Sequence, residues 1–347
     1  MKVSILGGGG LVGSSAAYAL QMGGKVSHVC LIDTNADLAK GHAYELLNSA
    51  ALTSDVRVSA GSMEDISSTD IVVITAGLRR KPDESRLDLI NRNVDLFLSL
   101  LSDVLKAGLK NSAYLLVVSN PVDVLTYLAV QRSGLPWQRV LGLGTQLDTA
   151  RLRGVLGQML GVPPSQINAL ILGEHGDSMV PIWSSAAING LPLAQWPGYS
   201  PGLGMKAFEE TKTAGATLIK LKGGSGMAVG HSIREVVEAI SGDLRRVLPV
   251  STLQQGLYGL RDVCLSVPTV VGCGGCRQQI ALTLLPKEQQ ALQQSARVLR
   301  DIIDQVESRI SKVRAETKLS STTPTLPRGN AVPEGLQRSI PRSAWGK

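Results

Sequence analysis

The sequence predicts an α/β fold in which a doubly wound parallel sheet is followed by a second, mixed α/β domain. Up to about residue 142, short β-branched runs alternate with amphipathic stretches, which is typical of parallel strands joined by crossover helices. After residue 142 the pattern changes to long helical stretches separated by hairpins. A length of 347 residues also favours two domains, because a single hydrophobic core rarely serves so long a chain.

The elements can be placed in order along the chain. In residues 1–142 we expect strands at 3–6, 29–32, 56–58, 71–75, 114–118 and 140–141, and helices at 14–21, 87–107 and 122–132. In residues 143–315 we expect helices at 148–160, 206–219, 232–243 and 289–314, and hairpins around 168–172 and 262–284. Residues 316–347 are rich in Ser, Thr, Pro and Gly without periodicity, which predicts a disordered tail.

Composition argues against several classes of protein. The formal net charge is +7, but aromatic residues make up only 3% and do not interleave with clustered Lys and Arg. We therefore expect no nucleic-acid binding, whereas an anionic ligand suits the same charge. Apolar runs fall far short of the roughly 18 residues that a membrane span needs, so no membrane partner is expected. The N-terminus lacks the pattern of a secretory signal, and we expect a cytoplasmic protein.

A glycine-rich segment follows the first expected strand. Gly8, Gly10 and Gly13 fit the pattern G-x-G-x-x-G, and the helical stretch 14–21 comes directly after it. Such glycines let backbone N–H groups approach a pyrophosphate at the positive end of a helix. Asp33 ends the second strand twenty residues later, where a carboxylate binds the ribose hydroxyls and repels a 2′-phosphate. The segment predicts a Rossmann-type NAD-binding domain over residues 1–142, with NAD preferred to NADP.

A histidine flanked by glycine lies at an expected strand end in the second domain. His175 stands in Gly173-Glu174-His175-Gly176-Asp177, and Asp148 and Arg151 lie three residues apart at the start of a helix. A buried Asp raises the proton affinity of a paired His, and Arg can hold a carboxylate with two hydrogen bonds. The alternative for Asp148 and Arg151 is an exposed ion pair on a helix surface.

These segments resemble the lactate/malate dehydrogenase family in order and spacing. The matching segments are Thr75-Ala76-Gly77, Glu84-Ser85-Arg86, residues 118–123 (VSNPVD), residues 147–151 (LDTAR) and residues 173–178 (GEHGDS). The resemblance covers the chain to about residue 315. It implies that His175 exchanges the hydroxyl proton, that Asp148 orients His175, that Arg151 holds the substrate carboxylate and that Arg86 polarises the substrate carbonyl.

The same resemblance implies the remaining site residues. Asn120 and Ser225 would contact the substrate, and no metal is expected. The cofactor site would be formed by Gly8, Gly10, Gly13, Asp33, Thr75, Ala76, Gly77, Asn93, Val118 and Asn120. The family also implies a homo-oligomer, either a dimer or a tetramer, that acts on a small-molecule substrate.

Arg80 decides the expected substrate. In this family the residue six before the loop arginine, Arg86, faces the variable group of the substrate, with Gln usual in lactate enzymes and Arg in malate enzymes. A buried Arg80 would need a second carboxylate, so the sequence predicts interconversion of malate and oxaloacetate, a dicarboxylate reaction of the tricarboxylic acid cycle. Met179 also resembles the malate pattern, whereas residues 181–185 (PIWSS) resemble lactate dehydrogenases.

Alternatives to the malate prediction stay open at this stage. Arg80 would lose its role if Arg79 or Lys81 were the inward residue. The first alternative is then an L-lactate dehydrogenase acting on pyruvate and lactate. The second is a catalytically silent protein that still binds NAD, which the presence of the complete set of catalytic residues argues against.

Two further features are predicted to have no role in activation, redox chemistry or metal binding. Many bacterial lactate enzymes of this family bind fructose 1,6-bisphosphate through an Arg and a His; this chain has Arg153 but Asn168, so we expect no such activation. Cys273 and Cys276 form a C-x-x-C pattern, which occurs in redox pairs and zinc sites. They fall where a hairpin turn is expected, and no second Cys/His pair has metal-site spacing, so turn residues are the favoured interpretation.

Overall fold

The computed structural model describes residues 1–78 and 83–321. Residues Met1–Val306 form one compact unit, and the chain from Glu307 onward is a second one. Arg80, on which the malate prediction depends, lies outside the described residues.

Six parallel strands form the centre of the main sheet. They are β1 (Lys2–Leu6), β2 (His28–Ile32), β3 (Arg57–Ala60), β4 (Ile71–Ile74), β5 (Tyr114–Val117) and β6 (Val140–Gly142). They lie in the order β3-β2-β1-β4-β5-β6, the doubly wound arrangement that the sequence predicts. β4 and β5 are buried along their whole length, as expected of a parallel sheet covered on both faces.

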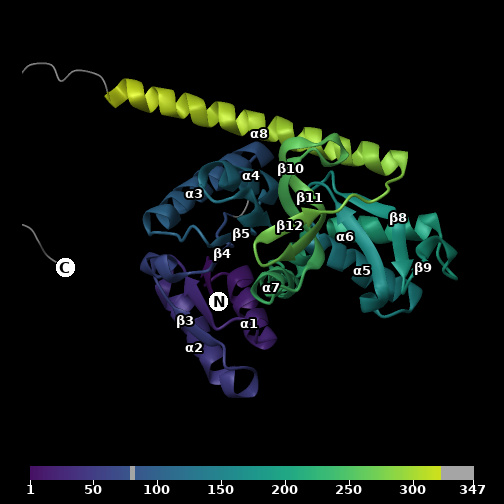
Figure 1. Ribbon diagram of the computed structural model, residues 1–347, viewed down its shortest axis with the longest axis horizontal. Helices are drawn as coiled ribbons and strands as arrows, with labels where there is room; N and C mark the ends of the chain where they lie inside the picture. The colour runs from purple at the N-terminus through teal and green to yellow at the C-terminus, as the bar shows by residue number, and fades with distance from the viewer. Residues whose placement is uncertain (79–82, 322–347) are drawn as a thin grey trace, which may run out of the picture. The chain divides into compact units, whose positions relative to one another are not determined.

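Helices cover both faces of these strands. They are α1 (Leu11–Gly23), α2 (Ala36–Ser49), α3 (Arg86–Lys106) and α4 (Val122–Arg132). In Figure 1, α3 and α4 lie on one side of the strands and α1 and α2 on the other. This layering brings the start of α1 and the starts of α3 and α4 to the carboxyl ends of the strands, where ligands bind in such sheets.

The second half of the chain extends this sheet. Strands β10 (Arg246–Gln255), β11 (Arg261–Gly272) and β12 (Gly275–Gln279) pair antiparallel with one another. β10 joins β6 through the pair Ser251 and Gly142, so that nine strands form one sheet. The sheet therefore continues through the boundary expected at residue 142.

A smaller three-stranded sheet lies beside the main one. It is formed by β7 (Ile167–Leu172), β8 (Val180–Ile188) and β9 (Leu191–Pro192), with α5 (Gln146–Leu160) and α6 (Pro201–Lys222). Leu152, Ile171 and Phe208 belong to its separate hydrophobic core. This is the mixed α/β part that the sequence predicts.

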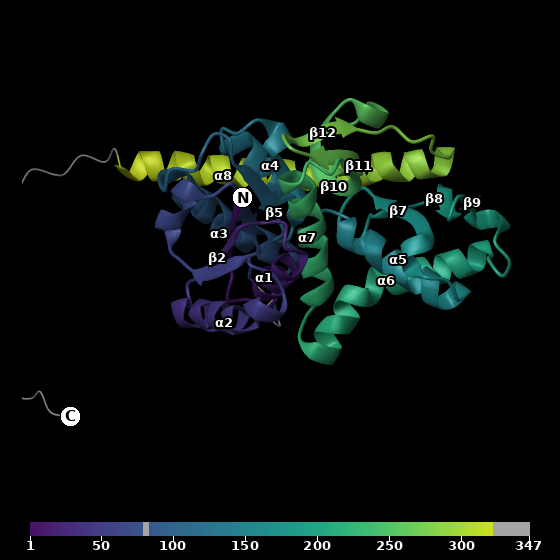
Figure 2. The same ribbon diagram turned by 60° about the horizontal axis from the view of Figure 1, so that its bottom comes forward.

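Helix α7 (Met227–Ser241) connects the two halves by packing along α1, as Figure 2 shows. A Cβ on Gly230 would lie 2.5 Å from the Ser15 carbonyl oxygen, so only glycine permits this close approach of the two helices.

Short 3-10 turns are η1 (Ala50–Leu52), η2 (Met63–Ser68), η3 (Trp137–Arg139), η4 (Pro164–Gln166), η5 (Leu193–Gln195) and η6 (Leu257–Gly259).

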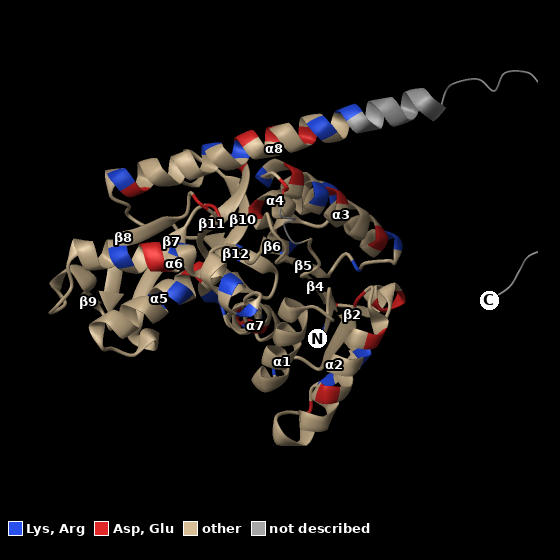
Figure 3. Cartoon of the chain, turned by 180° about the vertical axis from the view of Figure 1, so that it is seen from behind, with Lys and Arg blue, Asp and Glu red and all other residues tan. Residues whose placement is uncertain are grey.

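The last helix, α8 (Pro286–Ser321), is longer than expected. It buries Leu292, Leu299 and Ile303, and the Arg300 guanidinium lies 5.0 Å from the ring centre of Tyr127 on α4. Figure 3 shows both basic and acidic residues along it, with a long uncharged stretch near its start. It continues past residue 316, where the sequence predicts a disordered tail; residues 322–347 of that tail lie outside the described residues. Within the described part, no helix is long and apolar enough to cross a membrane.

Candidate active site

The structure brings His175 and Asp148 together. His175 lies in the loop after β7, and Asp148 lies in the first turn of α5. Their side chains are joined by a hydrogen bond of 2.5 Å between His175 Nδ1 and Asp148 Oδ2. The Asp148 side chain is 1% exposed and that of His175 is 21% exposed. Because Nδ1 faces the carboxylate, Nε2 is the ring nitrogen left for a substrate.

This pairing determines the charge of the imidazole. Burial lowers the pKa of His175, but the charge and hydrogen bond of Asp148 raise it more strongly, to about 9. Burial raises the pKa of Asp148, yet the charge and hydrogen bond of His175 bring the net pKa below its ordinary value. The imidazole is therefore protonated at neutral pH and can donate a proton through Nε2.

Arg151 joins the same cluster from α5. Its Nη1 lies 3.4 Å from Asp148 Oδ1, and its side chain is 14% exposed. The pair is thus not the exposed helix-surface ion pair that the sequence left open. A guanidinium has five N–H donors, and the Asp148 contact uses one of them, so donors remain for a ligand carboxylate.

Arg86 reaches the histidine loop from the start of α3. Its Nη1 donates to Asp177 Oδ2 at 2.6 Å, and its Nη2 lies 3.4 Å from Glu174 Oε1. The Arg86 side chain is 58% exposed, whereas that of Glu174 is only 7% exposed. The structure therefore places this second arginine on the acids that flank His175.

Hydrogen bonds from Ser295, Asp123 and Ser178, none of which was predicted as a site residue, hold the loop of His175. Ser295 on α8 accepts the N–H of Glu174 at 2.8 Å, and the Glu174 carboxylate accepts the hydroxyl of Ser178 at 2.5 Å. Asp123 on α4 accepts the N–H of His175 at 2.7 Å. The contacts of Ser295 and Asp123 join residues from distant parts of the sequence, and no local pattern encodes them.

The glycine-rich loop fits a dinucleotide. A Cβ on Gly13 would lie 2.3 Å from the Gly7 carbonyl oxygen, so this position accepts only glycine. Helix α1 begins after Gly10 without a side-chain cap and has no acidic residue in its first turn, so its N–H groups remain available to an anion. Asp33 accepts the N–H of Gly9 at 2.9 Å, which keeps a carboxylate at the edge of the loop.

The ends of β4 and β5 adjoin this loop. The Thr75 hydroxyl donates to the carbonyl of Leu6 at 2.9 Å, and the Ser119 hydroxyl donates to that of Ala76 at 2.6 Å. The main chain at Val118 continues the parallel pairing with β4. The ends of three neighbouring strands thus lie together, as the predicted cofactor site requires.

The other predicted contacts lie at the rim of this region. Asn93 uses its side chain to hold the main chain of Leu78, whose N–H it accepts at 2.7 Å, and Gly77 lies beside it. Asn120 is exposed and precedes a cis proline. Ser225 lies between α6 and α7, in the stretch whose neighbouring glycine, Gly226, faces the start of α1.

Cys273 lies in the turn between β11 and β12, whereas Cys276 lies in β12, where it pairs with Val271 of β11. Gly274 and Gly275 have φ angles of +98° and +86°, which suit a tight hairpin turn. Both cysteines are free thiols, and burial raises the pKa of Cys276 to about 12. Among the described residues, no group of three His, Cys, Asp or Glu side chains could hold a metal ion. The turn interpretation therefore fits Cys273, but not Cys276, which is a buried residue of β12.

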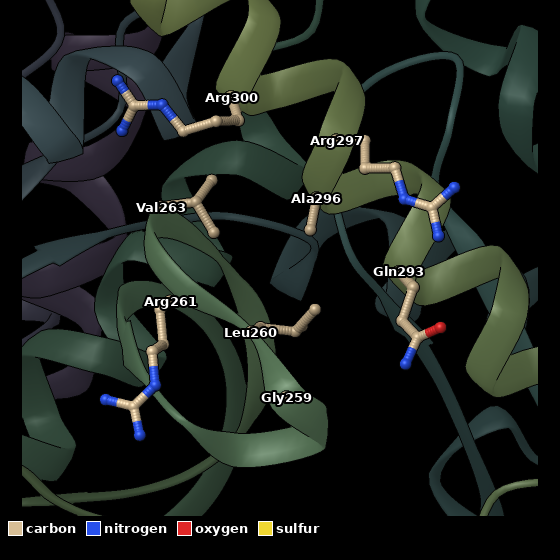
Figure 4. Close-up of a pocket in the computed structure, with 8 residues that line it drawn as sticks. All are labelled: Gly259, Leu260, Arg261, Val263, Gln293, Ala296, Arg297 and Arg300. Atoms are coloured by element: carbon tan, nitrogen blue, oxygen red, sulfur yellow. The ribbon is translucent and has the colours of Figure 1, made fainter.

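A cavity of about 370 Å³ lies between the β10–β11 turn and α8. Figure 4 shows Leu260 and Ala296 at its centre, Arg261 and Arg300 pointing to one side and Arg297 to the other. None of the predicted site residues lines it. The cavity is thus separate from the histidine site.

Comparisons with known proteins agree with this geometry. The family model for the lactate/malate dehydrogenase NAD-binding domain matches residues 1–142, and the model for the α/β C-terminal domain matches residues 145–310. The chain belongs to the lactate/malate dehydrogenase family. As a member of this family it is an NAD-dependent dehydrogenase with a Rossmann-type sheet, as the sequence predicts.

Similar members of the family are lactate enzymes. The L-lactate dehydrogenase of Synechococcus sp. (strain JA-3-3Ab) is 41% identical over 88% of this chain and 99% of its own length. L-lactate dehydrogenase 1 of Clostridium acetobutylicum is 39% identical over 88% of this chain and 98% of its own. The crystal structure of a minor L-lactate dehydrogenase from Enterococcus mundtii has a TM-score of 0.84 and 36% identity, covering 88% of this chain and 98% of its own.

The malate prediction from the sequence is therefore wrong, together with the assignment to the tricarboxylic acid cycle. It depended on Arg80 being buried against the substrate, and the identity of one loop residue does not establish which way its side chain points. Lactate dehydrogenases at this identity over nearly their full length outweigh that single position. Residues 181–185, which resemble lactate dehydrogenases, already favoured lactate over malate as the substrate.

Proposed function

We propose that this dehydrogenase is an L-lactate dehydrogenase that interconverts pyruvate and L-lactate. The observation that carries the proposal is its similarity to L-lactate dehydrogenases along nearly their whole length. It is combined with a His175–Asp148 pair, with Arg151 on Asp148 and Arg86 on the acids that flank His175. A small keto acid needs one cation for its carboxylate, one donor for its carbonyl and a group that exchanges a proton.

Two arginines divide the binding of the substrate. Arg151 is largely buried and tied to Asp148, which suits a fixed clamp on the carboxylate of pyruvate. Arg86 is more exposed, and its ion pairs with Glu174 and Asp177 keep it beside the histidine loop. We assign Arg86 to the C2 oxygen, where a guanidinium stabilises the negative charge that develops during reduction.

His175 exchanges the proton in this proposal. In pyruvate reduction, protonated Nε2 donates to the C2 oxygen as that oxygen becomes a hydroxyl. In lactate oxidation, neutral His175 takes the same proton back. Asp148 holds the ring through Nδ1 in both directions and stabilises the imidazolium form.

The glycine-rich loop and the strand ends would hold the cofactor. Gly8, Gly10 and Gly13 would bind the pyrophosphate at the start of α1, and Asp33 would bind the adenosine ribose. Residues 75–77, 93, 118 and 120 would contact the rest of the NAD molecule. NADH supplies the hydride when it is bound. Asn120 and Ser225 are assigned to the rim of the substrate site.

We also expect a homo-oligomer, as the resemblance to the family implies. Tyr44 and Leu47 on α2 are 67% and 58% exposed, and they offer apolar surface to a second copy of the chain. Light scattering on the purified chain tests this expectation, and a monomer at micromolar concentration would contradict it.

A comparison of substrates tests the proposed reaction. NADH oxidation is followed at 340 nm with pyruvate and with oxaloacetate, and NAD reduction with L-lactate and with D-lactate. We expect pyruvate to have a higher kcat/KM than oxaloacetate, and L-lactate a higher kcat/KM than D-lactate. A preference for oxaloacetate, or for D-lactate, would contradict the proposal.

A further inference from the structure

A second buried carboxylate holds the catalytic loop from the opposite side. Asp123 lies in the first turn of α4 and is 2% exposed. Its Oδ2 accepts the N–H of His175 at 2.7 Å. Its Oδ1 is also buried and has no hydrogen-bond partner within the described residues. The main-chain N–H of His175 is thus the principal partner of this carboxyl group.

The groups that face Asp123 come from three other segments. Ser251 lies on β10, and its hydroxyl favours the charged carboxylate. Cys264 lies on β11, and burial raises its thiol pKa, with the charge of Asp123 adding to the rise. Glu174 and His175 approach from the loop after β7. Of these groups, only His175 carries a positive charge.

Asp123 and His175 are electrostatically coupled. Burial raises the pKa of Asp123 to about 7, against the opposing effects of Ser251 and of the N–H and charge of His175, while Glu174 adds to the rise. On His175, burial lowers the pKa, Asp148 raises it, Asp123 raises it further and Arg151 lowers it. Two buried acids therefore hold His175, Asp148 on α5 at the ring and Asp123 on α4 at the main-chain N–H.

We propose that Asp123 is a positioning residue of the proton-transfer site, which anchors the main chain at His175 and holds a second negative charge beside its imidazole. The proposal builds on the proposed function, in which His175 exchanges the proton. Asp148 fixes the side chain of the histidine, and Asp123 fixes its backbone. A ring held at both points keeps Nε2 aimed at the substrate.

Two substitutions separate the anchor from the charge. Asp123→Asn removes the charge but keeps an oxygen that can accept the His175 N–H, and the unpaired Ser251 hydroxyl can accept from its amide. Asp123→Ala removes both. We expect both variants to lower the His175 pKa by about one pH unit, because one of two nearby negative charges is lost. Only Asp123→Ala should also lower kcat, since its loop is no longer anchored.

The pKa is read directly by NMR titration of the histidine ring in the full chain. The chain has only 4 histidines, and the spectrum of His175→Asn identifies the signal. Glu288→Gln is the matched control. Glu288 is also a buried carboxylate that accepts main-chain N–H groups, at 2.8 Å from Trp183 and 2.9 Å from Ser184, and its loss should leave the His175 pKa unchanged.

The titration does not require turnover, so it separates this proposal from the proposed function. A His175 pKa in Asp123→Asn within about 0.2 units of the unmodified chain would overturn the proposal, because a nearby charge shifts a pKa by more than that. If Asp123→Asn does not fold, the same electrostatic coupling is measured through the pKa of Asp123 instead. In His175→Asn the carboxyl pKa of Asp123, followed by ¹³C NMR, should rise; an unchanged value would overturn the proposal.

Discussion

The substitution Asp148→Asn tests the origin of the histidine's basicity. Asn keeps the size of the side chain and an oxygen that can accept from His175 Nδ1, but it removes the negative charge. The site stays buried, since Asp148 is 1% exposed and His175 is 21% exposed. The burial that lowers the pKa of His175 therefore persists, while its largest opposing effect is lost.

The expected size follows from the pKa of His175. The structure raises it from 6.5 to about 9. This difference of about 2.5 units corresponds to about 3 kcal/mol in favour of the charged imidazole. If the pKa returns to about 6.5, the protonated fraction at about pH 7.5 falls from nearly all of the enzyme to about one tenth. We therefore expect kcat/KM for pyruvate to fall about tenfold there from protonation alone.

The assay is the pH profile of pyruvate reduction at saturating NADH. The alkaline limb of kcat/KM should move to lower pH in Asp148→Asn, and the loss of activity should shrink below about pH 6, where His175 is protonated in both proteins. NADH affinity, measured by fluorescence, serves as the control and should not change. A loss of equal size at every pH would refute the electrostatic role of Asp148.

The remaining predictions concern binding. Arg151→Lys should raise the KM for pyruvate about tenfold or more with NADH affinity unchanged, because a point charge replaces a two-pronged clamp; an unchanged KM would remove Arg151 from the carboxylate site. Gly13→Ala should lower both the thermal midpoint and NADH affinity, measured by thermal melting and fluorescence, because its Cβ would lie 2.3 Å from the Gly7 carbonyl oxygen; wild-type values of both would contradict the loop geometry. Fructose 1,6-bisphosphate should leave the pyruvate saturation curve unchanged, because Asn168 offers no charge beside Arg153; a several-fold drop in KM on its addition would show that another cation completes an activator site.

The parallel sheet and its loop could be predicted because their causes are local. β-branched runs form buried strands. The glycines that follow the first strand and the acid that follows the second lie in the turns directly after these strands. Helix α2 and strand β10 are among the elements that the sequence did not predict. Helix α2 contains Gly41 and many polar residues, and β10 contains Pro249, which argues against an inner strand. Pro249 lies opposite Pro268 of β11, so the two strands place side by side two residues that both lack an N–H donor.

The histidine pair was predictable, but its support was not. His175, Asp148 and Arg151 each stand in a recognisable segment, and the structure brings all three together. Asp123 and Ser295 act on the loop from 52 and 121 residues away, and such distant contacts arise only when the chain folds. The substrate was mispredicted because the sequence gives the identity of a loop residue and not the direction of its side chain.

In the proposed L-lactate dehydrogenase reaction, one proton on His175 serves both directions. The most direct measurement is kcat/KM as a function of pH for pyruvate reduction and for L-lactate oxidation by the same preparation. Pyruvate reduction should decline, and L-lactate oxidation should rise, around a common pH above the ordinary histidine pKa of 6.5, because one direction uses protonated His175 and the other its neutral form. The assignment of His175 as the group that exchanges the proton would be contradicted if the two kcat/KM profiles changed several pH units apart. It would also be contradicted if these pH-dependent changes persisted in His175→Asn.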